Sequence, residues 1–455
     1  MGREEDKANR FGAIGEKIAK KCDGLPLAAR ALGALMHSKR KRGEWEDVLE
    51  SKIWVLKEVE QQVFQPLLLS YYELAPVIKR CLLYCDTFPK DYRMSKHNLI
   101  EMWMSQDYLS GKGYKEKEKT SQTVFETLVM RSFLQDVVED KLTIWDESIT
   151  IFCKMHDIVH DFVQFLNKNE CFIMEAKEAN GRISEEVRHL SLMHAPYGSP
   201  LSDFISAVNC KKLRTLAAFE SRMLHGSDLK AITLVKCLRT LNLRDTAIDE
   251  LPEEMGELIY LRLPENMGNL INLRHVHTEG CHELEYLPRG MARLTSLQTL
   301  NQCPIIDGEG LKLGDLGSLD QLQGSLTIKI MGRLEDAVSE AQMACLWNKK
   351  LFHLNLFLSH LEDAQDLEAL RPHQHLETLS ILGYGGSTAP SWMISLQNLR
   401  SLVLYMWNGC ESLPPLGNLP FLEQLDVAEM DKMKRVRWRC IFGHSNILIL
   451  LCFIP

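Results

Sequence analysis

The chain has 455 residues, of which 45% are hydrophobic and 25% are charged. A chain of this length exceeds what one hydrophobic core normally organises, so the sequence predicts two or three domains and excludes a single small module. The composition also excludes wholesale disorder and collagen-like structure. The formal net charge of -8 gives no general attraction to nucleic acid or to anionic lipid.

Cysteine usage and the apolar runs indicate a compartment. The 13 cysteines are scattered, without the dense regular spacing of a secreted disulfide framework, which favours a reducing environment. Residues 1–6 lack the apolar core of a signal peptide. The most apolar run, residues 447–455, is much shorter than the ~20 residues that a membrane-spanning helix needs. We therefore expect a cytoplasmic protein with no membrane span.

Residues 1–62 predict a helical subdomain. Apolar residues recur at helical spacing between 16 and 36, on both sides of Gly24-Leu25-Pro26. Pro26 can begin the second of these helices, because the first turn of a helix needs no N–H from it. A further helix is expected over residues 45–56.

Residues 63–168 predict a winged-helix subdomain. A long helical series covers 63–83, and a helix around 99–104 can be capped by Asp91 or Ser95. Two short strands, 133–138 and 142–145, are expected on either side of a turn at Glu139-Asp140, before a helix over 155–166. Such a fold can bind DNA or serve as a packing module. Because Lys and Arg do not cluster over 99–109, we expect no nucleic acid partner.

A repeated template dominates the chain from residue 187 onward. The pattern L-x-x-L, often extended to L-x-x-L-x-L, is typical of leucine-rich repeats, in which stacked neighbours bury the leucines of each short strand. The starts at 351, 376, 399 and 422 are 25, 23 and 23 residues apart, within the period of 20 to 29 that such repeats require. We predict a curved solenoid over residues 185–440, a linker over 169–184 and an atypical tail over 441–455. The template begins at Leu213, Leu238, Leu273, Leu297, Leu351, Leu376, Leu399 and Leu422.

Four stretches depart from the template. One repeat around 261–270 lacks most of its strand, and the interval of 54 residues from 297 to 351 holds a weaker strand at Leu322, Leu326 and Ile328. The basic run 432–439 is interpreted as a solvated face, although a patch for nucleic acid or lipid is an alternative. Residues 447–455 either cap the last repeat or result from an incorrect gene-model end.

The outward strand positions beside the leucines form a candidate protein-binding face. They are polar and almost uncharged. They can contact a protein partner or fold back on the winged helix, and we favour the partner by analogy with other repeat proteins. The candidates are Thr240, Asn242, His275, His277, Thr299, Asn301, His353, Asn355, Thr378 and Ser380.

Motifs typical of catalysis and of metal binding are absent from the sequence. The sequence contains no G-x-x-x-x-G-K-[ST] phosphate loop, no H-E-x-x-H, no G-x-S-x-G and no kinase signature set. Cys81 and Cys85 lie four apart without a matching second pair, so we assign them to core packing rather than to zinc. The sequence therefore predicts a protein that is not an enzyme.

Four ordered segments carry a family resemblance. They are Cys-Asp-Gly-Leu-Pro-Leu-Ala at 22–28, Cys-Leu-Leu-Tyr-Cys-Asp-Thr-Phe-Pro-Lys-Asp-Tyr at 81–92, Leu-Ile-Glu-Met-Trp at 99–103 and Lys-Met-His-Asp at 154–157. Together with the repeats they resemble, over residues 16–440, plant intracellular immune receptors of the coiled-coil NB-ARC leucine-rich-repeat type. The resemblance implies a multi-domain α plus α/β solenoid: a helical ARC1-like subdomain, a winged-helix ARC2-like subdomain and a leucine-rich-repeat horseshoe.

The resemblance also implies an ADP/ATP switch. Local sequence alone, without the resemblance, predicts that Pro26 begins a helix, that Asp157 caps a helix and that His156 is a hydrogen-bonded polar residue. In the family the phosphate loop and a coiled-coil domain precede the matched region, so we expect an N-terminally truncated receptor that by itself neither binds nucleotide normally nor hydrolyses ATP. The nucleotide-contacting candidates that the resemblance implies are Gly24, Leu25, Pro26, Leu27, His156 and Asp157.

The implied partner of the repeats is a pathogen effector or a host protein that the receptor guards. The alternative function is a leucine-rich-repeat scaffold unrelated to immunity. A third class, a nucleotide-hydrolysing switch, requires the phosphate-binding half from a longer product or a second chain.

Overall fold

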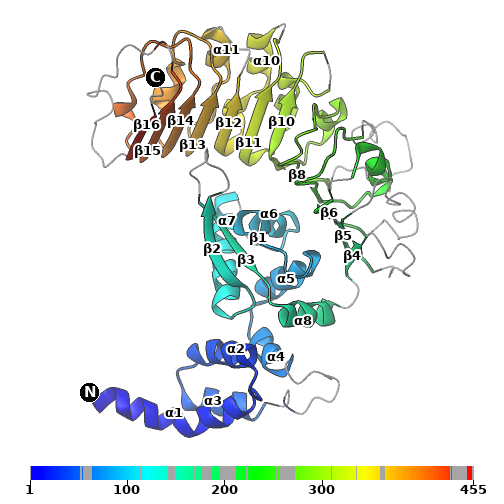
Figure 1. The fold of residues 1–455 in the computed structure, drawn as a ribbon, viewed down its shortest axis with the longest axis vertical. Helices are drawn as coiled ribbons and strands as arrows, with labels where there is room; N and C mark the ends of the chain where they lie inside the picture. Colours follow the sequence, from blue (N-terminus) through cyan, green and yellow to red (C-terminus); the bar gives the residue numbers. More distant parts are fainter. Residues whose placement is uncertain are drawn as a thin grey trace. The chain divides into compact units, whose positions relative to one another are not determined.

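The fold of the chain is given by a computed structural model (Figure 1). It divides into two compact units, residues 1–173 and 174–455, which are taken in turn. The described residues are 2–51, 54, 64–109, 111, 114–141, 149–167, 170–175, 186–194, 212–221, 224–252, 255, 272–308, 310–334, 336–358, 364–430, 432 and 448–452.

The first unit begins with four helices. As the sequence predicts, Pro26 occupies the first turn of the second helix. Ile18, Leu35 and Val48 are buried together with Leu69, so one small core holds these helices in contact. The helix expected over 45–56 begins earlier than predicted and ends at Leu49. The four are α1 (Gly2–Lys20), α2 (Pro26–His37), α3 (Arg42–Leu49) and α4 (Phe64–Tyr72).

The rest of the first unit is a winged helix, as predicted. Its small sheet is antiparallel with strand order β1-β3-β2. Trp103 is fully buried, and its indole N–H donates to the Cys81 carbonyl oxygen at 2.9 Å, which fixes α6 against α5. The elements are α5 (Pro76–Tyr84), η2 (Cys85–Thr87), β1 (Met94–Ser95), α6 (Lys96–Ser105), α7 (Tyr114–Met130), β2 (Gln135–Lys141), β3 (Ile149–Lys154) and α8 (Asp157–Asn167).

The hairpin of the winged helix corrects one prediction. Glu139 and Asp140 do not form a turn, because both belong to β2 and pair with Ile151 and Thr150 of β3. Their charges resemble a turn in the sequence, but an exposed strand tolerates charged side chains while its backbone pairs. The second strand predicted at 142–145 lies outside the described residues, and the strand that pairs with β2 is β3.

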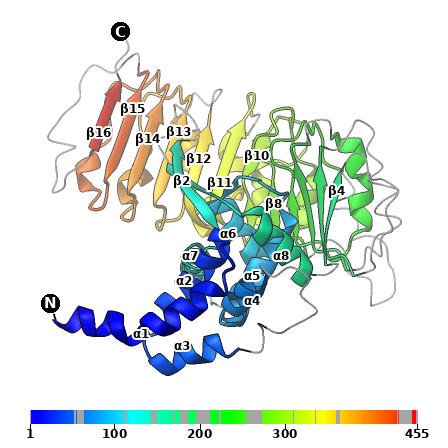
Figure 2. The same cartoon turned by 60° about the horizontal axis from the view of Figure 1, so that its bottom comes forward.

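Two sheets of short strands follow, in which β5 to β9 and β10 to β16 pair in parallel. Figure 2 shows β10 to β16 side by side in chain order. The first sheet contains β4 (Cys171–Glu175), β5 (His189–Met193), β6 (Thr215–Phe219), β7 (Thr240–Asn242), β8 (His275–His277) and β9 (Thr299–Leu300). The second contains β10 (Gln302–Ile305), β11 (Gln323–Ile330), β12 (Lys350–Phe357), β13 (Thr378–Leu382), β14 (Ser401–Tyr405), β15 (Gln424–Ala428) and β16 (Leu448–Cys452).

Short helices return the chain between strands. In Figure 1, α10 and α11 lie on the opposite side of the repeat core from the sheet β10–β16. The described short helices of the return segments are η3 (Gly226–Leu234), η7 (Arg289–Arg293), η8 (Leu313–Ser318), α10 (Ala337–Met343), η9 (Leu346–Asn348), α11 (Ala364–Ala369), η10 (Ser391–Ser395) and η11 (Leu416–Asn418).

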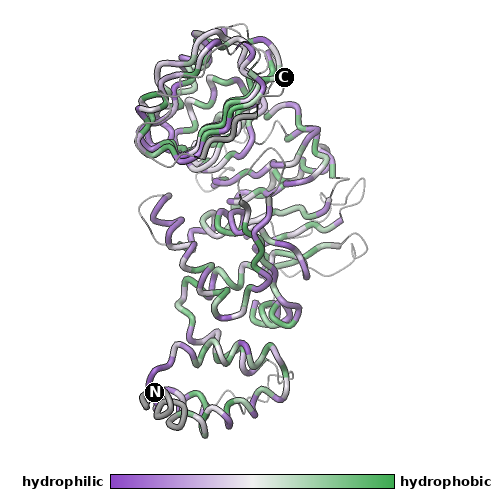
Figure 3. The backbone as a smooth tube through the Cα atoms, turned by 60° about the vertical axis from the view of Figure 1, so that its left-hand side comes forward, coloured by the Kyte–Doolittle hydropathy of each residue, from purple (hydrophilic) through white to green (hydrophobic). Residues whose placement is uncertain are grey.

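The leucines of the template form the core of the second unit. Leu379, Leu402 and Leu425 lie in register on neighbouring strands, and each is completely buried. The alternation of hydrophobic and hydrophilic residues along the repeats can be followed in Figure 3. Each such leucine contributes roughly 1.5–3 kcal/mol by leaving water, so neighbouring repeats stabilise one another. The predicted leucine-rich-repeat solenoid is therefore confirmed.

The two ends of the stack depart from the predicted boundaries. Residues 171–175 were expected in a linker, but they form β4, the first strand in the order of the six-stranded sheet. The apolar run from Cys171 to Met174 can pair as a strand without matching the leucine template. At the other end, residues 448–452 form β16 in register with β15, which agrees with a cap on the last repeat.

The irregular interval between residues 297 and 351 does contain a further strand. The weak strand predicted there is β11, which covers Gln323–Ile330 and pairs with β10 and β12. The irregular repeat at 261–270 and most of the basic run 432–439 lie outside the described residues.

Candidate protein-binding face and nucleotide motifs

The Gly-Leu-Pro-Leu segment forms the turn between α1 and α2. Gly24 has φ of 76° and follows Asp23 at 50°, so the turn uses two left-handed residues, a conformation that glycine adopts easily. The Leu25 N–H donates to the Cys22 carbonyl oxygen at 2.9 Å. Leu27, in the first turn of α2, is buried, whereas Gly24, Leu25 and Pro26 are exposed. The turn therefore leaves residues 24–26 accessible to solvent.

His156 lies just before α8 and caps its N-terminus. The Ile158 N–H donates to Nδ1 of His156 at 3.2 Å, and the His160 N–H donates to its carbonyl oxygen at 2.9 Å. Asp157 is not the cap that the local pattern predicts; it is the exposed first residue of the helix. Because Nδ1 accepts, a neutral imidazole carries its proton on Nε2. His156 therefore offers one N–H donor on its other nitrogen.

These two segments supply only part of a phosphate site. No hydrogen bond or ion pair joins the Gly24–Leu27 turn to His156 or Asp157 within the described residues. Phosphate binding in proteins ordinarily takes several converging backbone N–H groups and a cation. The turn and the imidazole can add to such a site, but they do not form one by themselves.

The predicted protein-binding positions of the first sheet are buried. Rather than standing in water, they bond across the strands: Nδ1 of His275 lies 3.0 Å from Oγ1 of Thr299, and Nδ1 of His277 lies 2.7 Å from Oδ1 of Asn301. The six residues are at most 4% exposed, and they are Thr240, Asn242, His275, His277, Thr299 and Asn301.

An ion pair extends this network. Nε of Arg244 lies 2.7 Å from a carboxylate oxygen of Glu279, and the Asn301 side-chain N–H donates to the other oxygen at 2.7 Å. The Arg244 side chain is only 8% exposed. The outward side of the first sheet is thus an ordered polar network rather than a solvated face.

A row of arginines precedes the strands of this sheet, which the sequence analysis missed. The N–H of Arg214 donates to the Arg188 carbonyl oxygen, and that of Arg239 to the Arg214 carbonyl oxygen, so the three are neighbours on successive strands. Burial, followed by the charges of Arg214, Arg188 and Arg239, lowers the pKa of His189 to about 3. His189 is therefore neutral, and its Nδ1 lies 3.0 Å from Oγ1 of Thr215.

The predicted positions of the second sheet are half-buried and remain accessible. Nδ1 of His353 lies 2.7 Å from Oγ1 of Thr378, which repeats the His–Thr contact of the first sheet. The Asn355 side-chain N–H donates to Oγ1 of Thr327 at 3.3 Å, and Asn355 pairs in register with Ser380. His353, Asn355, Thr378 and Ser380 are all partly exposed. Of the predicted face, this half is open to a partner.

A further outward column runs beside them, one residue after the last buried apolar residue of each strand. It consists of Phe357, Leu382, Tyr405 and Ala428, which pair in register on β12 to β15 and are half-buried. We call these four residues the apolar column. The predicted face included only polar positions, although the period of two predicts that this position also faces outward.

Charged residues stand at the two ends of the apolar column. At β11, Nζ of Lys329 lies 5.9 Å from the centre of the Phe357 ring. At the other end, Oη of Tyr405 on β14 donates to Glu429, which follows β15, at 2.6 Å. Asp426 lies on the outward side of β15. The column therefore runs from a basic end to an acidic end.

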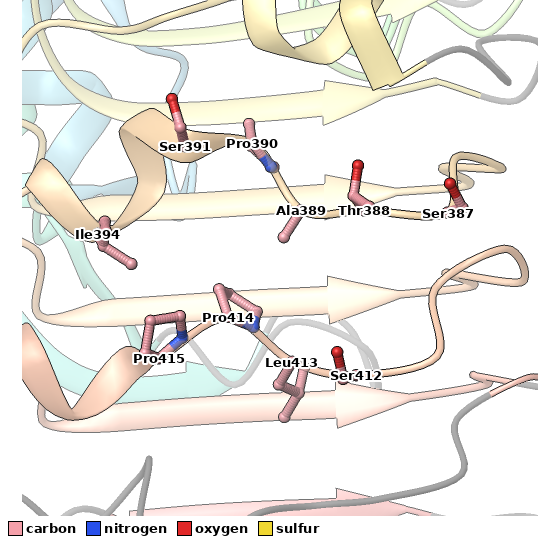
Figure 4. Close-up of a pocket in the computed structure, with 10 residues that line it drawn as sticks. All are labelled: Ser387, Thr388, Ala389, Pro390, Ser391, Ile394, Ser412, Leu413, Pro414 and Pro415. Carbon is pink, nitrogen blue, oxygen red and sulfur yellow. The ribbon is translucent and has the colours of Figure 1, made fainter.

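A cavity of about 270 Å³ lies between two return segments of the repeats (Figure 4). Hydroxyl groups of Ser387, Thr388, Ser391 and Ser412 line it together with apolar side chains and prolines 390, 414 and 415. None of its lining residues is an acid, a base or a cysteine.

Cys81 and Cys85 are buried in the winged helix. Burial raises the pKa of both thiols, so they are protonated core residues. Within the part of the chain that the structure describes, no group of three His, Cys, Asp or Glu side chains is placed to hold a metal. Nor is any helix there long and apolar enough to cross a membrane.

Comparison with known sequences agrees with this architecture. Residues 87–163 match the model of the disease resistance protein winged helix domain, and residues 313–430 match that of the R13L1/DRL21 leucine-rich repeats. Disease resistance protein RGA2 of Solanum bulbocastanum is 32% identical over 94% of this chain. The chain is thus similar to plant disease resistance proteins over nearly its whole length.

Other disease resistance proteins are similar to this chain as well. RGA1 of Solanum bulbocastanum is 32% identical over 94% of this chain, and disease resistance protein RPM1 of Arabidopsis thaliana is 28% identical over 55% of it. The chain spans 44% of the length of RGA1 and 45% of that of RGA2. The match to these disease resistance proteins thus includes both the winged helix and the repeats.

Proposed function

We propose that this chain is the regulatory and recognition part of an intracellular plant disease resistance protein, and that its repeats bind a protein. The single observation that carries the proposal is the outward side of the second sheet. There, polar groups of His353, Asn355 and Ser380 stand partly exposed on strands that buried leucines hold rigid. Such a preorganised surface loses little conformational entropy on binding.

The chemistry of this surface favours a protein over a polyanion. Its hydrogen-bonding groups are mostly neutral hydroxyl, amide and imidazole groups, whereas nucleic acid binding draws on rows of Lys and Arg. A pathogen effector or a host protein that the receptor guards fits this chemistry. Contact of the repeats with the winged helix is the competing occupant.

The first unit is proposed as the regulatory module of an ADP/ATP switch. The turn at Gly24 and the Nε2–H donor of His156 suit a contribution to a nucleotide site completed by a phosphate-binding half. We expect no ADP binding by this chain alone in a calorimetric titration. Tight binding that His156→Ala abolishes would show that this module is sufficient by itself. We propose a non-enzymatic role, because the matched winged-helix and leucine-rich-repeat domains suit binding and regulation.

Proximity labelling in infected leaf tissue tests the recognition role. The whole chain is compared with a His353→Glu and Ser380→Glu double variant and with Trp347→Glu, which changes an exposed residue of the return segment. We expect a pathogen or host protein to be labelled by the wild type and by Trp347→Glu, but not by the double variant. Equal labelling by all three would remove the second sheet as the binding surface.

A growth assay separates immunity from a general scaffold. If the chain acts in resistance, silencing its transcript increases pathogen growth in inoculated leaves. Unchanged growth, together with the same labelled protein in healthy and infected tissue, would favour the scaffold.

A further inference from the structure

The apolar column has a geometry that selects among possible ligands. Phe357 pairs with Leu382, Leu382 with Tyr405, and Tyr405 with Ala428, so one side chain per strand projects from the same side of the sheet. Neighbouring strands lie about 4.8 Å apart, so the column offers apolar contacts at that interval over about 14 Å. A ligand that follows it must place an apolar group at nearly the same interval.

Two regular peptide conformations can be compared with this interval. The apolar face of an α-helix repeats once per turn, about 5.4 Å. Side chains on one side of an extended chain repeat about every 6.7 Å. Over three strand steps the helix falls out of step by about 2 Å and the extended chain by about 6 Å, which exceeds one strand spacing. A helix laid across the strands therefore matches the column, and an extended chain does not.

The charges at the two ends of the apolar column favour one orientation of a bound helix. Lys329 adjoins Phe357 at the β11 end, while Asp426 and Glu429 belong to the β15 end. A helix carries a partial positive charge at its N-terminus and a partial negative charge at its C-terminus. The favourable orientation puts the N-terminus near β15 and the C-terminus near Lys329.

We infer that the apolar column binds an amphipathic α-helix of the protein partner, laid across β11 to β15 with its C-terminus at Lys329. From β11 to β15 the distance is about 19 Å, which corresponds to a helix of about 13 residues. Its apolar residues follow the spacing i, i+4, i+7 and i+11, and acidic residues suit its C-terminal turn. This inference rests on the proposed protein-binding function and specifies the structural class of the ligand.

A yeast-displayed library of random 14-residue segments, sorted with the purified whole chain, tests the inference. We expect enrichment of sequences with apolar residues at helical spacing and Asp or Glu in the last turn. Enrichment of two-residue alternation, or no enrichment of the helical spacing over the starting library, would overturn the inference.

Titration of a fluorescent peptide from that selection locates the site. Leu382→Asp and Ala428→Arg are each expected to weaken binding at least tenfold, because they place charge or bulk in the apolar column. The matched control Phe421→Asp changes an apolar side chain that is 54% exposed outside the column, and is expected to alter affinity less than twofold. Thermal unfolding verifies that each variant is folded. Binding that survives both column variants contradicts the inference.

A charge exchange tests the direction. Lys329→Glu is expected to lower the affinity for a peptide with an acidic C-terminal turn about tenfold. Replacing the acidic residues of that turn by Lys is expected to restore binding to the Lys329→Glu variant. The same response from a peptide with the charges at its N-terminus would reverse the orientation. If Leu382→Asp leaves the labelled partner of the proximity experiment bound while the His353 and Ser380 variant loses it, the recognition role stands and the helical ligand is wrong.

Discussion

The two sheets of the repeat unit share a template but differ in their outward sides. In the first sheet, His275 contacts Thr299 and is 1% exposed; in the second, His353 makes the same contact with Thr378 and remains partly exposed. The same residue pair thus serves an internal network in one place and an accessible surface in the other. A repeat motif identifies which side of a strand a residue occupies, but not whether that side meets solvent.

The largest effect is expected from the leucines that the sheets have in common. Leu241 and Leu379 are both completely buried. Replacing either by Ala is expected to lower the free energy of unfolding by about 4 kcal/mol, because transfer energy is lost and a cavity remains. Denaturant unfolding followed by circular dichroism measures both. A clearly smaller loss for Leu379→Ala would show that the second sheet lacks a comparable core.

Substitutions of His275 and His353 should differ in their effect on the free energy of unfolding. His275→Glu puts a charge into a buried network and is expected to destabilise the chain by about 3 kcal/mol. His353→Glu changes a partly exposed residue and should cost below about 1 kcal/mol. The same unfolding experiment compares them, and equal losses would contradict the difference in burial.

Acid should destabilise the first sheet through His189. Its pKa is lowered from 6.5 to about 3 in the folded chain, so the unfolded chain takes up a proton that the folded chain does not as pH falls below 6.5. By pH 5 this difference removes about 2 kcal/mol of stability. Unfolding at pH 7.5 and pH 5 measures the loss, and His189→Gln is expected to reduce it. An unchanged pH dependence in His189→Gln would remove His189 as the cause.

The smallest difference concerns an exposed ion pair. Nη1 of Arg400 lies 2.6 Å from Oε1 of Glu423 beside the second sheet, but the two side chains are 54% and 64% exposed. Arg400→Ala should therefore lower the free energy of unfolding by about 0.5 kcal/mol or less. Arg244→Ala removes the buried partner of Glu279 and is expected to cost more, about 2 kcal/mol. Added salt should weaken the first pair and hardly affect the second.

Sequence reasoning succeeded where periodicity decides the outcome. The leucine register predicted the buried positions, and Pro26 predicted the start of α2. It failed where pairing with a neighbouring strand determines the secondary structure. Glu139 and Asp140 belong to a strand despite their charge, and residues 171–175 form a strand although they lack the leucine template.

The candidate face was predicted only in part. The positions of His275 and His353 within their repeats are equivalent, so local sequence cannot distinguish their exposure. The apolar column was overlooked because Phe357 and Leu382 resemble core residues in composition, although their position in the strand alternation places them outward.

Hydroxyl-radical footprinting of the whole chain, read by mass spectrometry, tests the division of the face most directly. The account predicts rapid modification of His353 and Tyr405 and protection of His275 and His277. Equal modification of the two pairs of residues, or protection of His353 and Tyr405, would contradict it.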